Sequence, residues 1–162
     1  MQEGAQVDMA LALERPLAPA VASPEHVPSE SHESKLDVIV VFTSTESTLK
    51  ALKEAGALAE RLAARVTLLV PQIVPYPLPL TSPPVLLAFN ERRFHGLAAD
   101  SRVPTNVRIY LCRDRWSMLN LILKPHSLVV VGGTKHWWPT PETHLARRLR
   151  RSGHQVILVE TE

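Results

Sequence analysis

The sequence predicts an α/β domain in which parallel strands and helices alternate along the chain. Residues 38–41, 128–131 and 156–159 are runs of aliphatic side chains, as in parallel strands that helices cover on both faces. After the first run, apolar residues recur at every third or fourth position, which indicates a helix. The repeated alternation predicts an open doubly wound sheet with right-handed crossovers.

Each element has its own pattern. Strands are expected at 38–42, 65–70, 107–111, 128–131 and 155–159, and helices at about 47–64, 85–103, 116–124 and 141–152. The third strand alternates apolar and polar residues, so we expect it near a sheet edge. Ser47 or Thr45 is expected to cap the first helix. Thr140, a good N-cap followed by Pro141, marks the start of the last helix.

A proline-rich connection separates the second strand from the second helix. Six prolines occur in the fourteen residues from Pro71 to Pro84. Because proline has no amide hydrogen, this segment is expected to contain neither a continuous helix nor a central strand. Pro71 is therefore expected to open the loop.

The first 35 residues differ in composition from the rest. They are rich in Ala, Pro, Ser and Glu, and only residues 7–13 have an apolar helical pattern, too short for a stable isolated helix. We expect a disordered tail at 1–35 and one α/β domain at 36–162. The alternative is that the tail contains a docking peptide for a partner.

Composition limits the function classes. Of the 162 residues, 45% are hydrophobic and 21% charged, which is ordinary for a globular domain. The net charge of +2 does not favour nucleic-acid binding, which needs a concentrated positive field. No apolar run approaches the ~18 residues that would span a bilayer, and no secretion signal is apparent, so a cytoplasmic location is expected.

Cys112 is the one cysteine, so no internal disulfide can form. It ends an apolar strand pattern and is expected to be a small core residue. Arg113 and Arg115 beside it leave a redox role open, because nearby cations favour a thiolate.

Ligands of doubly wound folds bind beyond the carboxyl ends of strands, where the strand order reverses. The segments Thr43–Ser47 and Gly132–Pro141 are expected to meet at that point. Hydroxyls and glycines near a helix N-terminus suit an anion. The simpler interpretation is that the hydroxyls only cap the first helix.

Residues 38–52 resemble the opening strand, loop and helix of the universal stress protein family of bacteria. Residues 127–132 are similar to that family's fourth strand, and residues 155–159 to its last, so the resemblance covers about 125 residues. It implies the strand order 3-2-1-4-5, helices on both faces of a five-stranded sheet, and often a homodimer. Some members of the family bind ATP and others do not.

The nucleotide-binding pattern of that family is degenerate here. Thr43 stands at the position of its Asp and Ser44 at the following Gly, while Lys135 and Leu145 replace two of its three later glycines. Gly132 matches the first. We therefore expect no cofactor and a non-catalytic regulatory module of the stress response, with no enzymatic activity. The alternative is ATP, another nucleotide or a small anion at an altered site. That site would comprise Thr43, Ser44, Thr45, Gly132, Gly133, Thr134 and Lys135.

Three further features have two interpretations each. Of Trp137 and Trp138, either one ring covers the core and the other lies on the surface, or both pack on the domain. Residues 147–151 carry four arginines, which either complement the dipole of the last helix or bind an acidic partner. The strand Gln155–Val159 is expected at a sheet edge, where we expect it to pair with the same strand of a second copy in a homodimer; the alternative is that it is covered in a monomer. The seven histidines show no metal-ligand spacing, so no metal site is expected.

Overall fold

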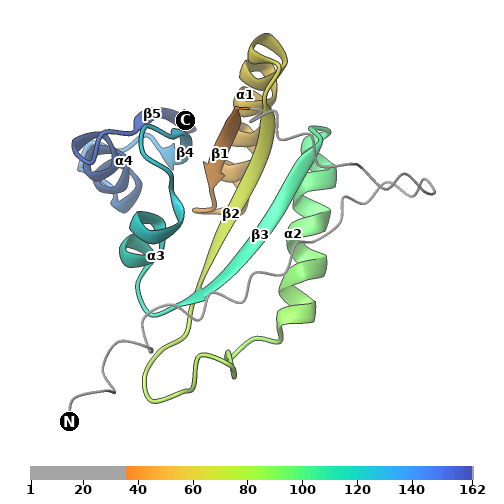
Figure 1. The fold of residues 1–162 in the computed structure, drawn as a ribbon, viewed down its shortest axis with the longest axis vertical. Helices are drawn as coiled ribbons and strands as arrows, with labels where there is room; N and C mark the ends of the chain where they lie inside the picture. The colour runs from red at the N-terminus through yellow and green to blue at the C-terminus, as the bar shows by residue number, and fades with distance from the viewer. Residues whose placement is uncertain (1–35, 162) are drawn as a thin grey trace.

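The computed structural model describes residues 36–161, so the predicted tail at 1–35 lies outside the described residues. Five parallel strands form one sheet in the order β3-β2-β1-β4-β5, with four helices (Figure 1). The strands are β1 (Asp37–Val41), β2 (Arg65–Ile73), β3 (Thr105–Cys112), β4 (Leu128–Thr134) and β5 (Gln155–Thr161). The helices are α1 (Thr45–Leu62), α2 (Leu87–Ser101), α3 (Arg115–Ile122) and α4 (Pro141–Arg151).

This strand order confirms the predicted doubly wound fold. It reverses at β1, so the carboxyl ends of β1 and β4 form the switch point. β3 and β5 lie at the two edges, as the sequence predicts. Within residues 36–161, no helix combines the length and the apolar character that crossing a membrane requires.

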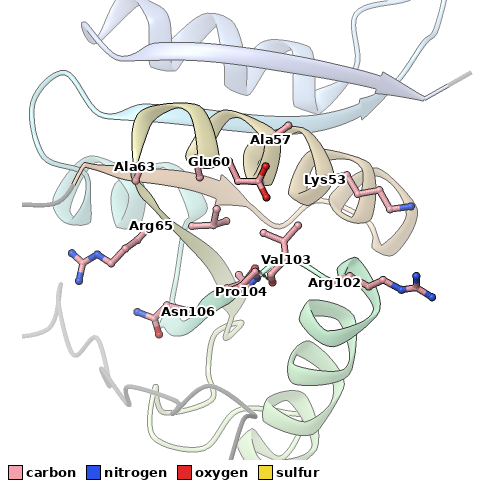
Figure 2. A pocket seen from close by; sticks show the side chains of 14 residues that line it. Lys53, Ala57, Glu60, Ala63, Arg65, Arg102, Val103, Pro104 and Asn106 are labelled. Atoms are coloured by element: carbon pink, nitrogen blue, oxygen red, sulfur yellow. Dashed lines mark hydrogen bonds between the residues drawn. The ribbon is translucent and has the colours of Figure 1, made fainter. Parts of the chain in front are cut away.

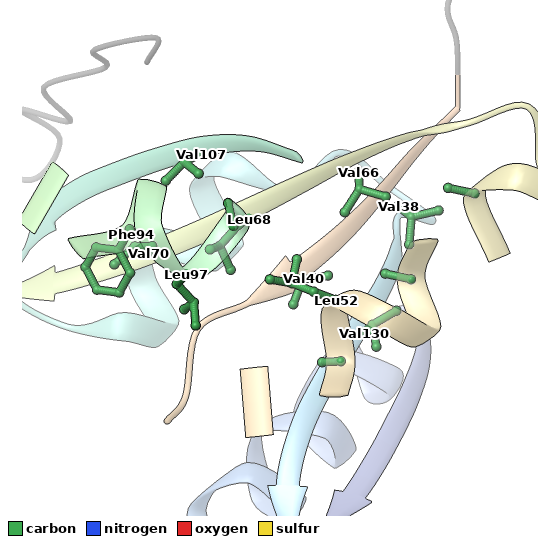
Figure 3. Close-up of a cluster of buried hydrophobic side chains, with 14 of the residues drawn as sticks. Val38, Val40, Leu52, Val66, Leu68, Val70, Phe94, Leu97, Val107 and Val130 are labelled. Atoms are coloured by element: carbon green, nitrogen blue, oxygen red, sulfur yellow. The ribbon is translucent and has the colours of Figure 1, made fainter. Parts of the chain in front are cut away.

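Helices cover both faces of the sheet, which explains why its central strands are apolar throughout. Alternate residues of one strand point to opposite faces. Val40 packs with α1 and α2 in one core cluster, and Val41 packs with α3 and α4 in the other. Figure 3 shows the first cluster, in which Leu52 of α1 and Phe94 of α2 lie against β1 and β2.

Helix α1 begins two residues earlier than the sequence predicts. Its N-cap is Ser44, whose hydroxyl accepts a hydrogen bond from the Ser47 N–H at 3.3 Å. Neither predicted cap is correct, because Ser47 lies inside the first turn and is buried, and Thr45 is already helical. The helix ends at Ala63, which adopts the left-handed conformation.

The prediction that Pro71 opens the loop is wrong. β2 continues through Pro71 to Ile73, although it lies between β1 and β3. The Leu69 carbonyl accepts the Phe42 N–H at 2.9 Å, so Leu69 faces β1, and Pro71, two residues later, faces the same side. β1 ends at Val41. An amide hydrogen at position 71 would face the β1 side of β2, where β1 has already ended. The lack of this hydrogen in Pro71 therefore costs the sheet no hydrogen bond.

Candidate functional site

The switch point is closed by the side chain of Thr43. Its Oγ1 donates to the Gly132 carbonyl at 2.8 Å, and its N–H donates to Oγ1 of the fully buried Thr48 at 3.2 Å. Just beyond the last residue pair of β1 and β4, the Thr43 hydroxyl thus donates the hydrogen bond that a backbone amide donates within the sheet. Thr43 and Gly132 do lie together, as expected, and their contact connects β1, β4 and α1.

Gly132 has a packing reason to be glycine. A Cβ at this position would lie 2.1 Å from the Ser47 carbonyl oxygen. The first turn of α1 therefore rests directly on the backbone of β4. There is no room for a side chain between them, so packing alone requires glycine at this position.

The predicted glycine loop is a strand, which corrects the prediction that the fourth strand ends at Val131. Gly132, Gly133 and Thr134 belong to β4 and pair with β5. Thr161 holds this end of the ladder, since its Oγ1 donates to the Gly133 carbonyl at 3.1 Å and its carbonyl accepts the Lys135 N–H at 2.9 Å. Extended, paired backbone does not form a concave cradle of N–H groups for phosphate.

The remaining predicted site residues divide into two groups. Ser44 caps α1, and Thr45 is its first residue. Thr134 and Lys135 are exposed at the end of β4. Among the contacts within residues 36–161, none joins Lys135 to the Thr43–Thr45 segment. In the part of the chain that the structure describes, hydrogen bonds thus connect Thr43 with Gly132 but do not connect Lys135 with the hydroxyls.

A further cation, Arg93 of α2, lies at the carboxyl edge of the sheet, and the sequence analysis did not identify it. Its Nη2 lies 3.5 Å from Oγ1 of Thr45, and its guanidinium carbon lies 5.9 Å and 5.3 Å from the ring centroids of Phe42 and Phe94. Every helix of this fold begins at the carboxyl edge of the sheet. A cation in the early turns of α2 is the sequence signal that would have found it.

Arg113 fixes the proline-rich connection between β2 and α2. Its Nη1 donates to three carbonyls of that loop, those of Val74 (3.0 Å), Pro75 (3.3 Å) and Leu78 (2.8 Å). Its guanidinium carbon also lies 4.1 Å from the ring centroid of Tyr76. Bonds from one ionised, planar donor to several carbonyls order a segment that has no regular structure of its own.

Cys112 is a buried core residue, as the sequence predicts. Burial, with the nearby Asp114 carboxylate as a smaller cause, raises the pKa of the thiol to about 11. Arg115 lowers the pKa, but by less than these two raise it. The side chain is therefore a protonated thiol at neutral pH and a poor nucleophile.

We expect alkylation of Cys112 by iodoacetamide at pH 7.5 to be at least about 100-fold slower than that of a free cysteine peptide, because the thiolate is the reacting species. A raised pKa keeps the thiol protonated through neutral pH, so the rate should keep rising until the pH passes about 11. Mass spectrometry of the intact chain measures the rate. A rate that levels off below pH 8 would show that the thiol is activated.

Both interpretations of the tryptophan pair are wrong. Trp137 is 93% exposed and Trp138 76% exposed, so neither ring covers the core. The space beside Gly133 is already filled, because a Cβ there would lie 3.2 Å from Cβ of Glu142 and 3.6 Å from Cδ1 of Leu158. The first turn of α4 therefore packs against the sheet end, and the tryptophans remain outside.

The arginine run of α4 has structural contacts. Leu145 and Leu149 face the core. The guanidinium carbon of Arg148 lies 4.1 Å from the ring centroid of Trp116, and Arg150 donates to the Val156 carbonyl at 3.0 Å. These contacts support a structural role for part of the run. Residues 36–161 contain no group of three or more His, Cys, Asp or Glu side chains placed to hold a metal ion.

Comparison with known proteins found a structural likeness but no relative by sequence. No protein-family model matches the chain, and no curated protein matches it. Among solved structures, a universal stress protein in complex with cAMP is similar to it, with 17% sequence identity and a TM-score of 0.48 over 78% of this chain and 98% of that chain. The fold assignment stands on the strand order of the sheet itself.

Proposed function

We propose that this chain is a non-catalytic regulatory binding module of the universal stress type, and that it acts as a homodimer. One observation carries the proposal. The hydroxyl of Thr43 and the backbone of Gly132, which occupy the ligand-binding positions of this fold, hold β1, β4 and α1 together. The resemblance of residues 38–52, 127–132 and 155–159 to that family supports the same function.

The edge strand β5 supports the homodimer. Its outward-facing backbone groups belong to residues 156, 158 and 160, since Gln155 donates to the Ser127 carbonyl on the β4 side. Arg150 occupies the outward carbonyl of Val156. This leaves the outward groups of Leu158 and Glu160 to pair with the same residues of a second copy, antiparallel about a two-fold axis.

Side chains beside β5 suit such an interface. Ile157 is 40% exposed and borders a hollow of about 140 Å³ between β5 and α1. Glu54 and Arg61 of α1 line the same hollow. A two-fold axis perpendicular to the sheet would place these charged residues of both subunits on the same face of the joined sheet, beside the exposed Ile157 side chains.

Light scattering of the full chain tests the assembly. We expect a species of about 36 kDa, twice the 18.0 kDa chain mass, and a shift toward the monomer on Ile157→Lys. Leu121→Lys is the matched control, because Leu121 is 61% exposed on α3, away from β5. A wild type of about 18 kDa at high micromolar concentration would rule out the homodimer.

An anion- or nucleotide-binding function is the second candidate, and the position of Arg93 favours it. This cation and the N-terminus of α1 lie together at Thr45. The two together would attract a phosphate group. If this function is correct, ATP should change the fluorescence of Trp137 and Trp138 saturably, and Arg93→Gln should weaken its binding about ten-fold or more. Under the first proposal the fluorescence stays unchanged up to about 1 mM ATP.

A further inference from the structure

A hollow of about 770 Å³ lies at the amino-terminal end of the sheet, between the last turns of α1 and the connection from α2 to β3 (Figure 2). Arg65 and Thr105, the first residues of β2 and β3, line it. It is therefore at the opposite end of the strands from the switch point. Its volume is within the range of about 300–1,000 Å³ that is usual for small-molecule sites.

The sequence of α1 creates this hollow. Ala59 and Ala64 have no side chain beyond Cβ, so they leave space above Val66. A Cβ at Gly56 would lie 2.6 Å from Cγ2 of Val103, which packs directly against the helix backbone. α2 ends at Ser101, so the opposite wall is the short connection and not a helix. The lining is mostly apolar.

Charged side chains surround the apolar lining unevenly. Figure 2 shows the side chains of Lys53 and Arg102 extending outward on the same side of the hollow, away from Val103 and Pro104, and that of Arg65 extending outward on the opposite side. Arg65 is bonded to Asp37 at 3.1 Å, whereas Lys53 and Arg102 form no ion pair within residues 36–161. Glu60 lies on the α1 wall. One side therefore concentrates positive charge.

Arg102 has a backbone conformation that glycine adopts more easily. It is the C-cap of α2 and has a φ of 57°, in the left-handed region. For residues with a Cβ this region is disfavoured, and glycine is the usual residue at such caps. The cation of Arg102 is therefore carried by a backbone position that costs some stability, as at Ala63, the C-cap of α1.

From the volume, the apolar lining and the two cations Lys53 and Arg102 on one side, we propose that the hollow binds an amphipathic organic anion. Its apolar body would lie over Val66 and Val103, and its acid group would lie between Lys53 and Arg102. Burial of the body supplies most of the affinity, and the two cations select the anion over an uncharged analogue. This proposal does not depend on the function proposed above, because the two sites lie at opposite ends of the strands.

The variant Arg102→Gly separates binding from stability. It removes the cation and relieves the backbone conformation. We expect its Tm to rise by about 2–4 °C while its affinity for dodecanoate falls about three- to ten-fold. Affinity for dodecanol, which has the same body without the charge, should stay within about two-fold. Chemical shifts of the ¹⁵N-labelled full chain measure both affinities and locate the ligand.

Three more variants complete the test. Pro104→Trp should block both ligands, because a large ring would fill the hollow from an exposed position. Glu60→Gln should tighten dodecanoate by about two- to five-fold, whereas Lys50→Gln, on α1 but outside the hollow, should change nothing. The proposal is overturned if dodecanoate does not bind up to about 1 mM, if it perturbs residues 134–140 and not residues 53–66, or if Arg102→Gly binds it as tightly as the wild type.

Discussion

Replacing Gly132 with alanine should lower the free energy of unfolding by about 3 kcal/mol or more. The added Cβ would lie 2.1 Å from the carbonyl oxygen of Ser47 and 2.6 Å from its carbonyl carbon. These are backbone atoms, so no rotamer change relieves the overlap. Either β4 or α1 must move, and α1 is held by the fully buried Leu52 and Ala55.

Two other glycines provide matched controls. Gly96→Ala, in α2, meets no atom within 4 Å and should stabilise the domain by about 0.5–1 kcal/mol through helix propensity. Gly133→Ala, 3.2 Å from Cβ of Glu142, should have an effect between the two. Urea denaturation measures all three. A Gly132→Ala protein within about 0.5 kcal/mol of the wild type would show that α1 does not rest on β4.

Loss of Arg113 should release the proline-rich loop. We expect Arg113→Met to lower the free energy of unfolding by about 2 kcal/mol, because three loop carbonyls lose a charged donor and Tyr76 loses its stacking partner. Cleavage between residues 75 and 86 should become at least about ten-fold faster, since opening of the loop is the step that exposes it.

Two variants control for charge and size in this experiment. Arg113→Lys keeps the charge but loses the planar fork, so it should lie between the wild type and Arg113→Met. Arg115→Met removes a neighbouring cation that is not bonded to the loop and should leave the cleavage rate unchanged. Equal rates for Arg113→Met and the wild type would contradict a structural role for Arg113.

Much of the fold could be predicted because its signals are local. The aliphatic runs identified β1, β4 and β5, and Thr140 with Pro141 marked the start of α4, where the Thr140 hydroxyl accepts the Thr143 N–H. Parallel strands covered on both faces leave a continuous apolar run, which is hard to mistake. The alternation with helices then restricts the topology to a small number of possibilities.

The errors came from features that depend on neighbours in space. Pro71 is compatible with β2 because the neighbouring strand β1 has already ended beside it. The sequence of one strand does not show where its neighbour in the sheet ends. The close approach of the Ser47 backbone in α1 to Gly132 is a further contact that the sequence analysis did not find. Arg93 was missed because its partner Thr45 is 48 residues away. These contacts are fixed only when the elements pack.

The central claim is that Thr43 and Gly132 serve the fold and do not form a phosphate site. Calorimetric titration of the full chain with MgATP tests it most directly. The claim predicts no binding tighter than a Kd of about 1 mM, or about −4 kcal/mol. A saturable heat with a micromolar Kd, about −8 kcal/mol, requires a dedicated site and would contradict the claim.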